Sequence, residues 1–176
     1  MAQPDTKQER PTGWRGIWEP TRSVLSTLGL MAALMMGMAV LMARGPSASP
    51  APAFVAPTSE GGQLALVDGS HRPVVLYFWA TWCGACKMTS PTVSNYAKRH
   101  PEVRVIGVAV DEPAAVRAYL KDTPRDFKTV FDDGRIAKRY GIQAYPTTFA
   151  IGTHGRVNWS RQGVLMPGEL DFRAGE

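Results

Sequence analysis

The stretch that decides the fold is VVLYFWATWCGACKM, residues 74–88. Its first half, residues 74–80, is a continuous β-branched and aromatic run, which is typical of a strand buried on both faces of a sheet. Its second half holds the chain's two cysteines, three positions apart. A cysteine pair at this spacing, where a strand passes into a helix, indicates a redox-active pair rather than a structural crosslink.

The segments around this stretch alternate between extended and helical patterns. Helices are expected at 87–100, with a kink at Pro91, at 112–121 and at 135–140. Further strands are expected at 63–67, 103–110 and 129–131, and a closing hairpin at 147–151 and 156–160. Strands that alternate with helices and end in a hairpin predict an α/β sandwich with a mixed central sheet.

The N-terminal part of the chain has a different composition. Residues 23–43 carry no charge, and at ~1.5 Å rise per residue such a helix covers roughly the 30 Å hydrocarbon core of a bilayer. We therefore expect one transmembrane helix there. A cleaved signal peptide is the alternative, although its apolar core is usually only ~7 to 15 residues long.

Charge around this run predicts its orientation. Lys7, Arg10, Arg15 and Arg22 precede it, whereas only Arg44 follows closely, and basic residues favour the cytoplasmic side. The N-terminus is therefore expected in the cytoplasm. The net charge of +5 is small for 176 residues, so we expect no nucleic-acid partner.

These patterns divide the chain into four parts. The segment 44–59 is rich in proline, which disfavours both helices and the hydrogen-bond ladders of sheets. Its composition predicts an extended spacer. The predicted parts are a cytoplasmic tail (1–22), a transmembrane anchor (23–43), a Pro/Ala/Ser-rich linker (44–59) and a folded domain (60–176).

The cysteine pair predicts dithiol exchange, which requires an accessible thiolate and a second thiol that resolves the mixed disulfide. If a helix begins near Cys83, its sulfur lies at the positive end of the helix dipole, which lowers the pKa of the thiol from ~8.5. Cys86, about one turn further along, is then the resolving thiol. Gly84 and Ala85 carry no charge, so we expect a moderate pKa shift and a reducing or intermediate couple.

Residues 74–163 resemble the thioredoxin superfamily. FWATWCGACKM (78–88), followed by Pro91, matches the active-site strand, motif and kinked helix of that family, and YGIQAYPT (140–147) resembles the segment that carries its cis-proline. The resemblance implies a thioredoxin-like three-layer sandwich. It also implies a set of functional residues, with Cys83 and Cys86 as catalytic and Trp82, Gly84, Ala85, Tyr145 and Pro146 as substrate-binding residues.

With its anchor and proline-rich tether, the chain is most similar to periplasm-facing members of the superfamily. These are the cytochrome-c-maturation proteins of the DsbE/TlpA type and the suppressor-of-copper-sensitivity D-type proteins. The similarity implies a single-pass protein of the bacterial inner membrane with a periplasmic catalytic domain. Its partners would be protein substrates with disulfides or thiols and a membrane thiol protein that donates electrons, with no cofactor beyond the redox-active disulfide.

Four residues depart from the family pattern, among them the bulky Tyr145 before the cis-proline. Tyr77 occupies the place of the buried aspartate of thioredoxin, Thr89 that of a glutamate in the maturation reductases, and Ala85 that of a proline. Proton relay through a buried carboxylate is therefore not expected here.

Other functions of the cysteine pair stay open. Net reduction of substrate disulfides is the primary prediction, and oxidation or isomerisation is the alternative within the class. A Cu(I)-binding chaperone is a second class, because soft thiolates suit that ion. Structural zinc is disfavoured because it needs four ligands, and His71, His100 and His154 lack a paired spacing, so no resident metal is expected.

Overall fold

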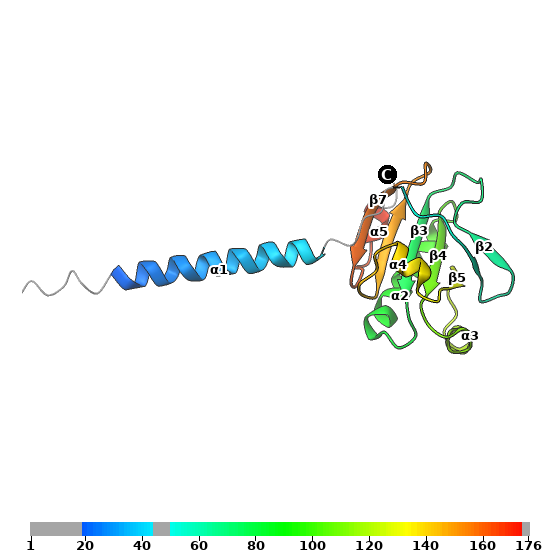
Figure 1. Cartoon of the computed structure of the whole chain (residues 1–176), viewed down its shortest axis with the longest axis horizontal. Coiled ribbons are helices and arrows are strands. Elements are labelled where there is room, and N and C mark those ends of the chain that lie inside the picture. The colour runs from blue at the N-terminus through cyan, green and yellow to red at the C-terminus, as the bar shows by residue number, and fades with distance from the viewer. Residues whose placement is uncertain (1–18, 44–49, 174–176) are drawn as a thin grey trace, which may run out of the picture. The chain divides into compact units, whose positions relative to one another are not determined.

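The computed structural model describes residues 19–43 and 50–173 (Figure 1). The chain divides into two compact units, Met1–Leu41 and Met42–Glu176. The helix α1 (Glu19–Ala43), which lies in the first unit except for its last two residues, contains the whole predicted span 23–43. Among the described residues, however, no helix is long and apolar enough to cross a bilayer, so the predicted crossing is not confirmed. Positions 7, 10 and 15, which carry the predicted orientation, lie outside the described part.

The second unit is built on a five-stranded sheet with the order β5-β4-β3-β6-β7 (Figure 1). The central strand β3 (Val74–Trp79) pairs in parallel with β4 (Arg104–Ala109) and antiparallel with β6 (Thr147–Ile151). Outside these lie β5 (Lys128–Phe131), parallel to β4, and β7 (Val157–Gln162), antiparallel to β6. The mixed sheet is as predicted, and all of β3 is buried, as its apolar run indicated.

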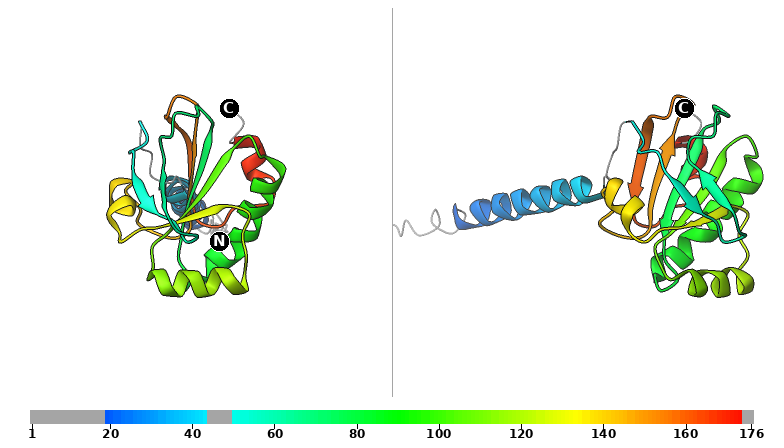
Figure 2. Two further views of the ribbon diagram at one scale, coloured as in Figure 1. Left: turned by 90° about the vertical axis from the view of Figure 1, so that its right-hand side faces the viewer. Right: turned by 45° about the vertical axis from the view of Figure 1, so that its right-hand side comes forward.

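Alternate side chains of β3 enter two separate cores, because successive residues of a strand point to opposite faces. Tyr77 and its same-face neighbours pack with α2 (Gly84–Arg99), α3 (Pro113–Asp122) and α5 (Glu169–Arg173). Phe78 and its same-face neighbours pack with α4 (Arg135–Arg139) and with the segments around β1 and β2. Figure 2 shows α2 and α5 on one side of the sheet and α4 with β1 and β2 on the other.

The strands β1 (Val55–Pro57) and β2 (Gln63–Ala65) form a separate antiparallel pair. The structure differs here from the predicted linker 44–59, because β1 and the buried Phe54 and Ala56 belong to the folded unit. Apolar burial outweighs the proline content, and Pro57 is tolerated because β1 is an edge strand of a two-stranded pair. Residues 44–49 of the predicted linker lie outside the described part.

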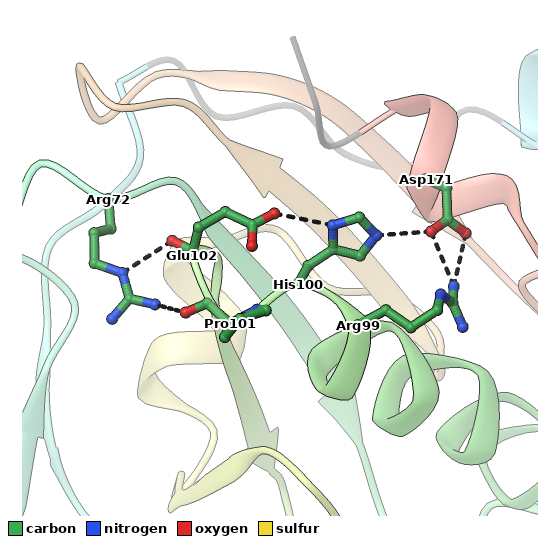
Figure 3. A network of polar contacts seen from close by, with 6 residues as sticks. All are labelled: Arg72, Arg99, His100, Pro101, Glu102 and Asp171. Carbon is green, nitrogen blue, oxygen red and sulfur yellow. Dashed lines mark hydrogen bonds and ion pairs between the residues drawn. The ribbon is translucent and has the colours of Figure 1, made fainter.

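The C-terminal end of α2 is tied down by charged side chains (Figure 3). Arg99 Nη2 donates to both carboxylate oxygens of Asp171 in α5, each at 2.9 Å. The His100 ring lies between Asp171 Oδ1, 2.8 Å from Nε2, and Glu102 Oε1, 2.9 Å from Nδ1. Arg72 closes the network by donating to the backbone carbonyls of Pro101 and Glu102.

Gly107 in β4 marks a place where the core has no room for a side chain. A Cβ atom there would lie 2.6 Å from Phe127 Cε2 and 2.9 Å from Trp79 Nε1. Such separations are well below van der Waals contact, so a larger residue would displace these aromatic rings.

Candidate active site

Cys83 is the N-cap residue of α2, with the extended backbone angles φ −82° and ψ 107°. Its sulfur accepts a hydrogen bond from the Cys86 backbone N–H at 3.1 Å. Its carbonyl oxygen accepts from the N–H groups of Cys86 and Lys87 at 3.1 and 3.2 Å. The sulfur therefore lies at the positive end of the helix dipole, where negative charge is stabilised. Helix α2 begins at Gly84, earlier than the predicted 87–100. A helix that begins next to Cys83 is the condition under which a lowered pKa of the Cys83 thiol was predicted.

Cys83 and Cys86 form a disulfide, with sulfurs 2.22 Å and Cα atoms 5.2 Å apart. Cys83 is 7% exposed and Cys86 only 1%. The two sulfurs thus differ in access, because an incoming molecule meets Cys83 before Cys86. The roles of Cys83 as nucleophile and Cys86 as resolving thiol stay predictions.

Tyr77 and Ser90 form a buried polar pair beneath Cys86. The Tyr77 hydroxyl donates to the Cys86 carbonyl oxygen at 3.0 Å and lies 3.1 Å from Ser90 Oγ. Burial raises the pKa of Tyr77 well above its ordinary value, so the phenol stays protonated and remains a donor. The sequence identified Tyr77 as a replacement for an aspartate, but it gave no sign of Ser90 as its partner.

Trp82 and Tyr145 bring the two family motifs together. Their ring centroids are 5.9 Å apart in an edge-to-face arrangement, a favourable geometry for aromatic pairs. Trp82 is 67% exposed, and the peptide bond between Tyr145 and Pro146 is cis. The segment at 145–146, with the cis-proline that the resemblance implied, therefore lies beside the cysteine motif.

The predicted substrate-binding residues differ in accessibility. Gly84 is exposed like Trp82, Ala85 and Tyr145 are half-buried, and Pro146 is buried. Burial also raises the pKa of the Tyr145 phenol, which keeps it neutral. The accessible surface around Cys83 is accordingly aromatic and uncharged at these positions.

Asp111 is a neighbour of the motif that the sequence analysis missed. Its Oδ2 accepts from the Thr81 backbone N–H at 3.3 Å and also from the Thr81 hydroxyl. The signal was available in principle, because β3 and β4 are parallel with Trp79 opposite Ala109. Thr81 and Asp111, each two positions after this pair, therefore meet where the two strands end. The hydrogen bonds from Thr81 to Asp111 hold the start of the loop that carries Trp82.

A cavity of about 840 Å³ opens next to this contact. Asp111 and Glu112 line one part of it, and α4 contributes Arg135 and Arg139. Backbone and side chains near β1, including Phe54, supply apolar surface. The cavity thus combines apolar walls with charges of both signs.

The histidines do not gather around the cysteines. His100 belongs to the charged network at the other end of α2, and His154 contacts Thr153. Within residues 19–43 and 50–173, no cluster of three or more His, Cys, Asp or Glu side chains could hold a metal ion.

The geometry defines a class of protein. A cysteine pair at the start of a helix, beside a cis-proline and on a mixed five-stranded sheet, is the arrangement of a thioredoxin-like thiol:disulfide oxidoreductase. The chain belongs to the AhpC/TSA family, whose sequence model matches residues 48–160.

Individual relatives agree with this assignment. The chain is 34% identical to the thiol-disulfide oxidoreductase ResA of Bacillus thuringiensis subsp. konkukian over 125 residues, 69% of this chain and 72% of the relative. It is 32% identical to the thiol:disulfide interchange protein DsbE of Xylella fastidiosa over 121 residues, 66% of this chain and 61% of the relative. The solved structure of MTB dsbF, in mixed oxidised and reduced forms, matches with a TM-score of 0.64 and 31% identity, over 69% of this chain and 92% of that one.

Proposed function

We propose that this oxidoreductase reduces disulfides in extracytoplasmic protein substrates, with Cys83 as nucleophile and Cys86 as resolving thiol. The single observation that carries the proposal is the position of the Cys83 sulfur, at the N-cap of α2 and in contact with the Cys86 N–H. In the dithiol form, the same N–H would donate to the Cys83 thiolate and stabilise it moderately. A moderately stabilised thiolate belongs to a reducing or intermediate couple rather than to a strong oxidant.

The reaction takes two exchange steps that start from the dithiol. The Cys83 thiolate attacks one substrate sulfur, the substrate disulfide breaks, and the departing substrate sulfur takes up a proton. Cys86 then loses its proton and attacks Cys83 Sγ, which releases the second substrate thiol and leaves the Cys83–Cys86 disulfide. Two electrons pass from the protein to the substrate, and a separate membrane thiol protein restores the dithiol.

Substrate contacts are assigned to the surface around Cys83. We infer that Trp82, Gly84 and Ala85 from the motif, together with Tyr145 and Pro146, contact the substrate chain. Supporting this, the exposed Trp82, which directly precedes Cys83 in the chain, packs its ring against Tyr145. An aromatic, uncharged rim suits an unfolded or extended polypeptide near its disulfide.

The direction of electron flow is tested by the exchange equilibrium with glutathione. We expect a reduction potential more negative than about −200 mV, in the range of reducing thioredoxin-like proteins. A value near about −120 mV would instead assign the chain to oxidation. Stoichiometric Cu(I) uptake without reduction of insulin disulfides would favour the copper-chaperone alternative.

The order of attack is tested by trapping. In the Cys86→Ser variant, the mixed disulfide at Cys83 cannot be resolved, so the natural substrate should stay covalently attached. The matched variant Cys83→Ser should trap nothing, because Cys86 is almost fully buried. Equal trapping by both variants would contradict the assigned roles.

We further propose that residues 23–43 attach the chain to the inner membrane, with the folded unit in the periplasm. The support is the uncharged run itself and the exposure of its large apolar side chains, among them Leu28, Met31, Leu34 and Met35. Contiguous exposed apolar surface marks a membrane or protein contact. Resistance of the full chain to alkaline extraction, and activity of alkaline phosphatase fused after residue 176, test attachment and orientation separately.

A further inference from the structure

The resolving cysteine is held from two sides by different kinds of hydrogen bond. Its N–H donates to the Cys83 sulfur at 3.1 Å, and its carbonyl oxygen accepts from the Tyr77 hydroxyl at 3.0 Å. One residue therefore connects the buried phenol of β3 with the sulfur that begins the reaction. A movement of Cys86 would change the N–H···S contact directly.

Helix α2 needs such a hold close to Cys86. Pro91 lies inside the helix, and because proline lacks an N–H, it removes the helical bond to the carbonyl of Lys87, the residue after Cys86. The Thr89 hydroxyl bonds back to the Ala85 carbonyl at 3.0 Å. Side-chain bonds thus supplement the backbone ladder in the turn that carries Cys86.

Tyr77 is itself rigidly placed. It is fully buried, its ring packs edge-to-face on Phe127 at 5.9 Å, and its strand is paired on both sides. Because the phenol donates its one proton to Cys86, the contact with Ser90 Oγ is a bond donated by Ser90 to the phenol oxygen. Such a chain strengthens the outer bond, since each donor polarises the next.

We propose that Tyr77 is a positioning residue for thiol-disulfide exchange, which fixes Cys86 so that its N–H stays directed at the Cys83 sulfur. This role rests on the proposed function of the cysteine pair. Tyr77 does not act as a proton acceptor, because its phenol stays protonated. It holds Cys86 in the position from which the Cys86 N–H stabilises the Cys83 thiolate.

The test is the Tyr77→Phe variant of the full chain, reduced and held in detergent. The rate of Cys83 alkylation by iodoacetamide is measured against pH, with the modified cysteine located by mass spectrometry. We expect the thiolate fraction below the thiol pKa to fall about threefold, of the order that one net hydrogen bond supplies. The exchange equilibrium with glutathione should move by a similar factor toward the disulfide, because the reduced form loses its thiolate stabilisation.

The matched control is Ser90→Ala, which removes a buried hydroxyl of the same pair but leaves the Tyr77 bond to Cys86. Its effect on Cys83 ionisation should be clearly smaller than that of Tyr77→Phe. If both variants lower the melting temperature while the Cys83 pH profile and the exchange equilibrium stay at wild-type values, Tyr77 only packs, and the proposal is overturned.

A second measurement covers the case in which Tyr77→Phe fails to fold. Site-specific replacement of Tyr77 by 3,5-difluorotyrosine keeps the hydroxyl and makes it a stronger donor, so the Cys83 thiolate fraction should rise. An unchanged or lower fraction would contradict the positioning role. Neither readout uses a protein substrate, whereas loss of trapping in Cys86→Ser would count against the proposed function alone.

Discussion

The two ends of helix α2 are held by opposite kinds of chemistry. At its start, Cys83 meets backbone N–H groups and an uncharged aromatic rim. At its end, Arg99 and His100 meet the carboxylates of Glu102 and Asp171 (Figure 3). Charges near the sulfur would shift its ionisation strongly, whereas charges one helix length away anchor the helix without that effect. The reactive cysteines and the charged residues that attach the helix thus lie at opposite ends of α2.

The largest expected effect comes from the reactive end. Cys83→Ala should lower the rate of insulin-disulfide reduction by at least ~1000-fold, because the nucleophile is lost. Asp171→Asn, at the other end of the same helix, should retain most of the activity in the same assay. A large activity loss in Asp171→Asn with a folded protein would break the proposed separation.

The next effect concerns how α2 is attached. Leu170 in α5 is 1% exposed and packs in the core beneath α2, so Leu170→Ala should lower the free energy of unfolding by about 2–4 kcal/mol. Phe172→Ala, in the same short helix but exposed, should change it by less than about 0.5 kcal/mol. Urea unfolding of the two variants measures both values, and equal losses would mean that α5 is not docked as described.

A smaller effect is expected at the rim of the reactive end. Trp82→Ala should lower kcat/KM for a protein disulfide about tenfold, the size typical of an exposed aromatic anchor in an interface. The rate with oxidised glutathione should stay nearly unchanged, because a small disulfide does not need the rim. Parallel losses with both substrates would show that Trp82 supports the cysteines rather than the substrate.

The smallest effect is a pH dependence at the charged end. Hydrogen bonds to Asp171 and then Glu102 raise the pKa of His100 above its ordinary value. A raised pKa stabilises the fold fully below about pH 6.5, and this contribution is lost as the pH rises through the raised value. Because the ring is partly exposed, we expect at most ~1 kcal/mol.

This contribution is measured as the difference in melting temperature between wild type and His100→Gln from pH 5 to 9. The advantage of the wild type should shrink as the pH rises. An advantage that grows with pH would have the wrong sign and would rule out protonated His100 as an anchor.

The sequence predicted the reactive end of α2 far better than the rest of the site. The strand at 74–80 and the cysteine motif are local signals, since an apolar run and a fixed spacing need no knowledge of distant residues. The same holds for Tyr145 and Pro146, which the family resemblance marked. The sequence alone was therefore enough to predict these elements and the mixed sheet.

The missed features all depend on contacts distant in sequence. Asp171 lies 71 positions from His100, and Asp111 meets Thr81 only through the register of β3 and β4. The strand β1 was hidden because the prolines of its segment indicated a spacer, whereas burial of Phe54 and Ala56 is a tertiary effect. The sequence pattern shows that prolines disfavour a strand here, but it does not show whether Phe54 and Ala56 become buried.

The tight fit at Gly107 links a remote position to the reaction. A side chain there would push on Phe127, and Phe127 packs on the ring of Tyr77. A side chain at position 107 would therefore disturb Trp79 and Phe127 together, and through Phe127 it would reach the phenol that bonds to the Cys86 carbonyl oxygen.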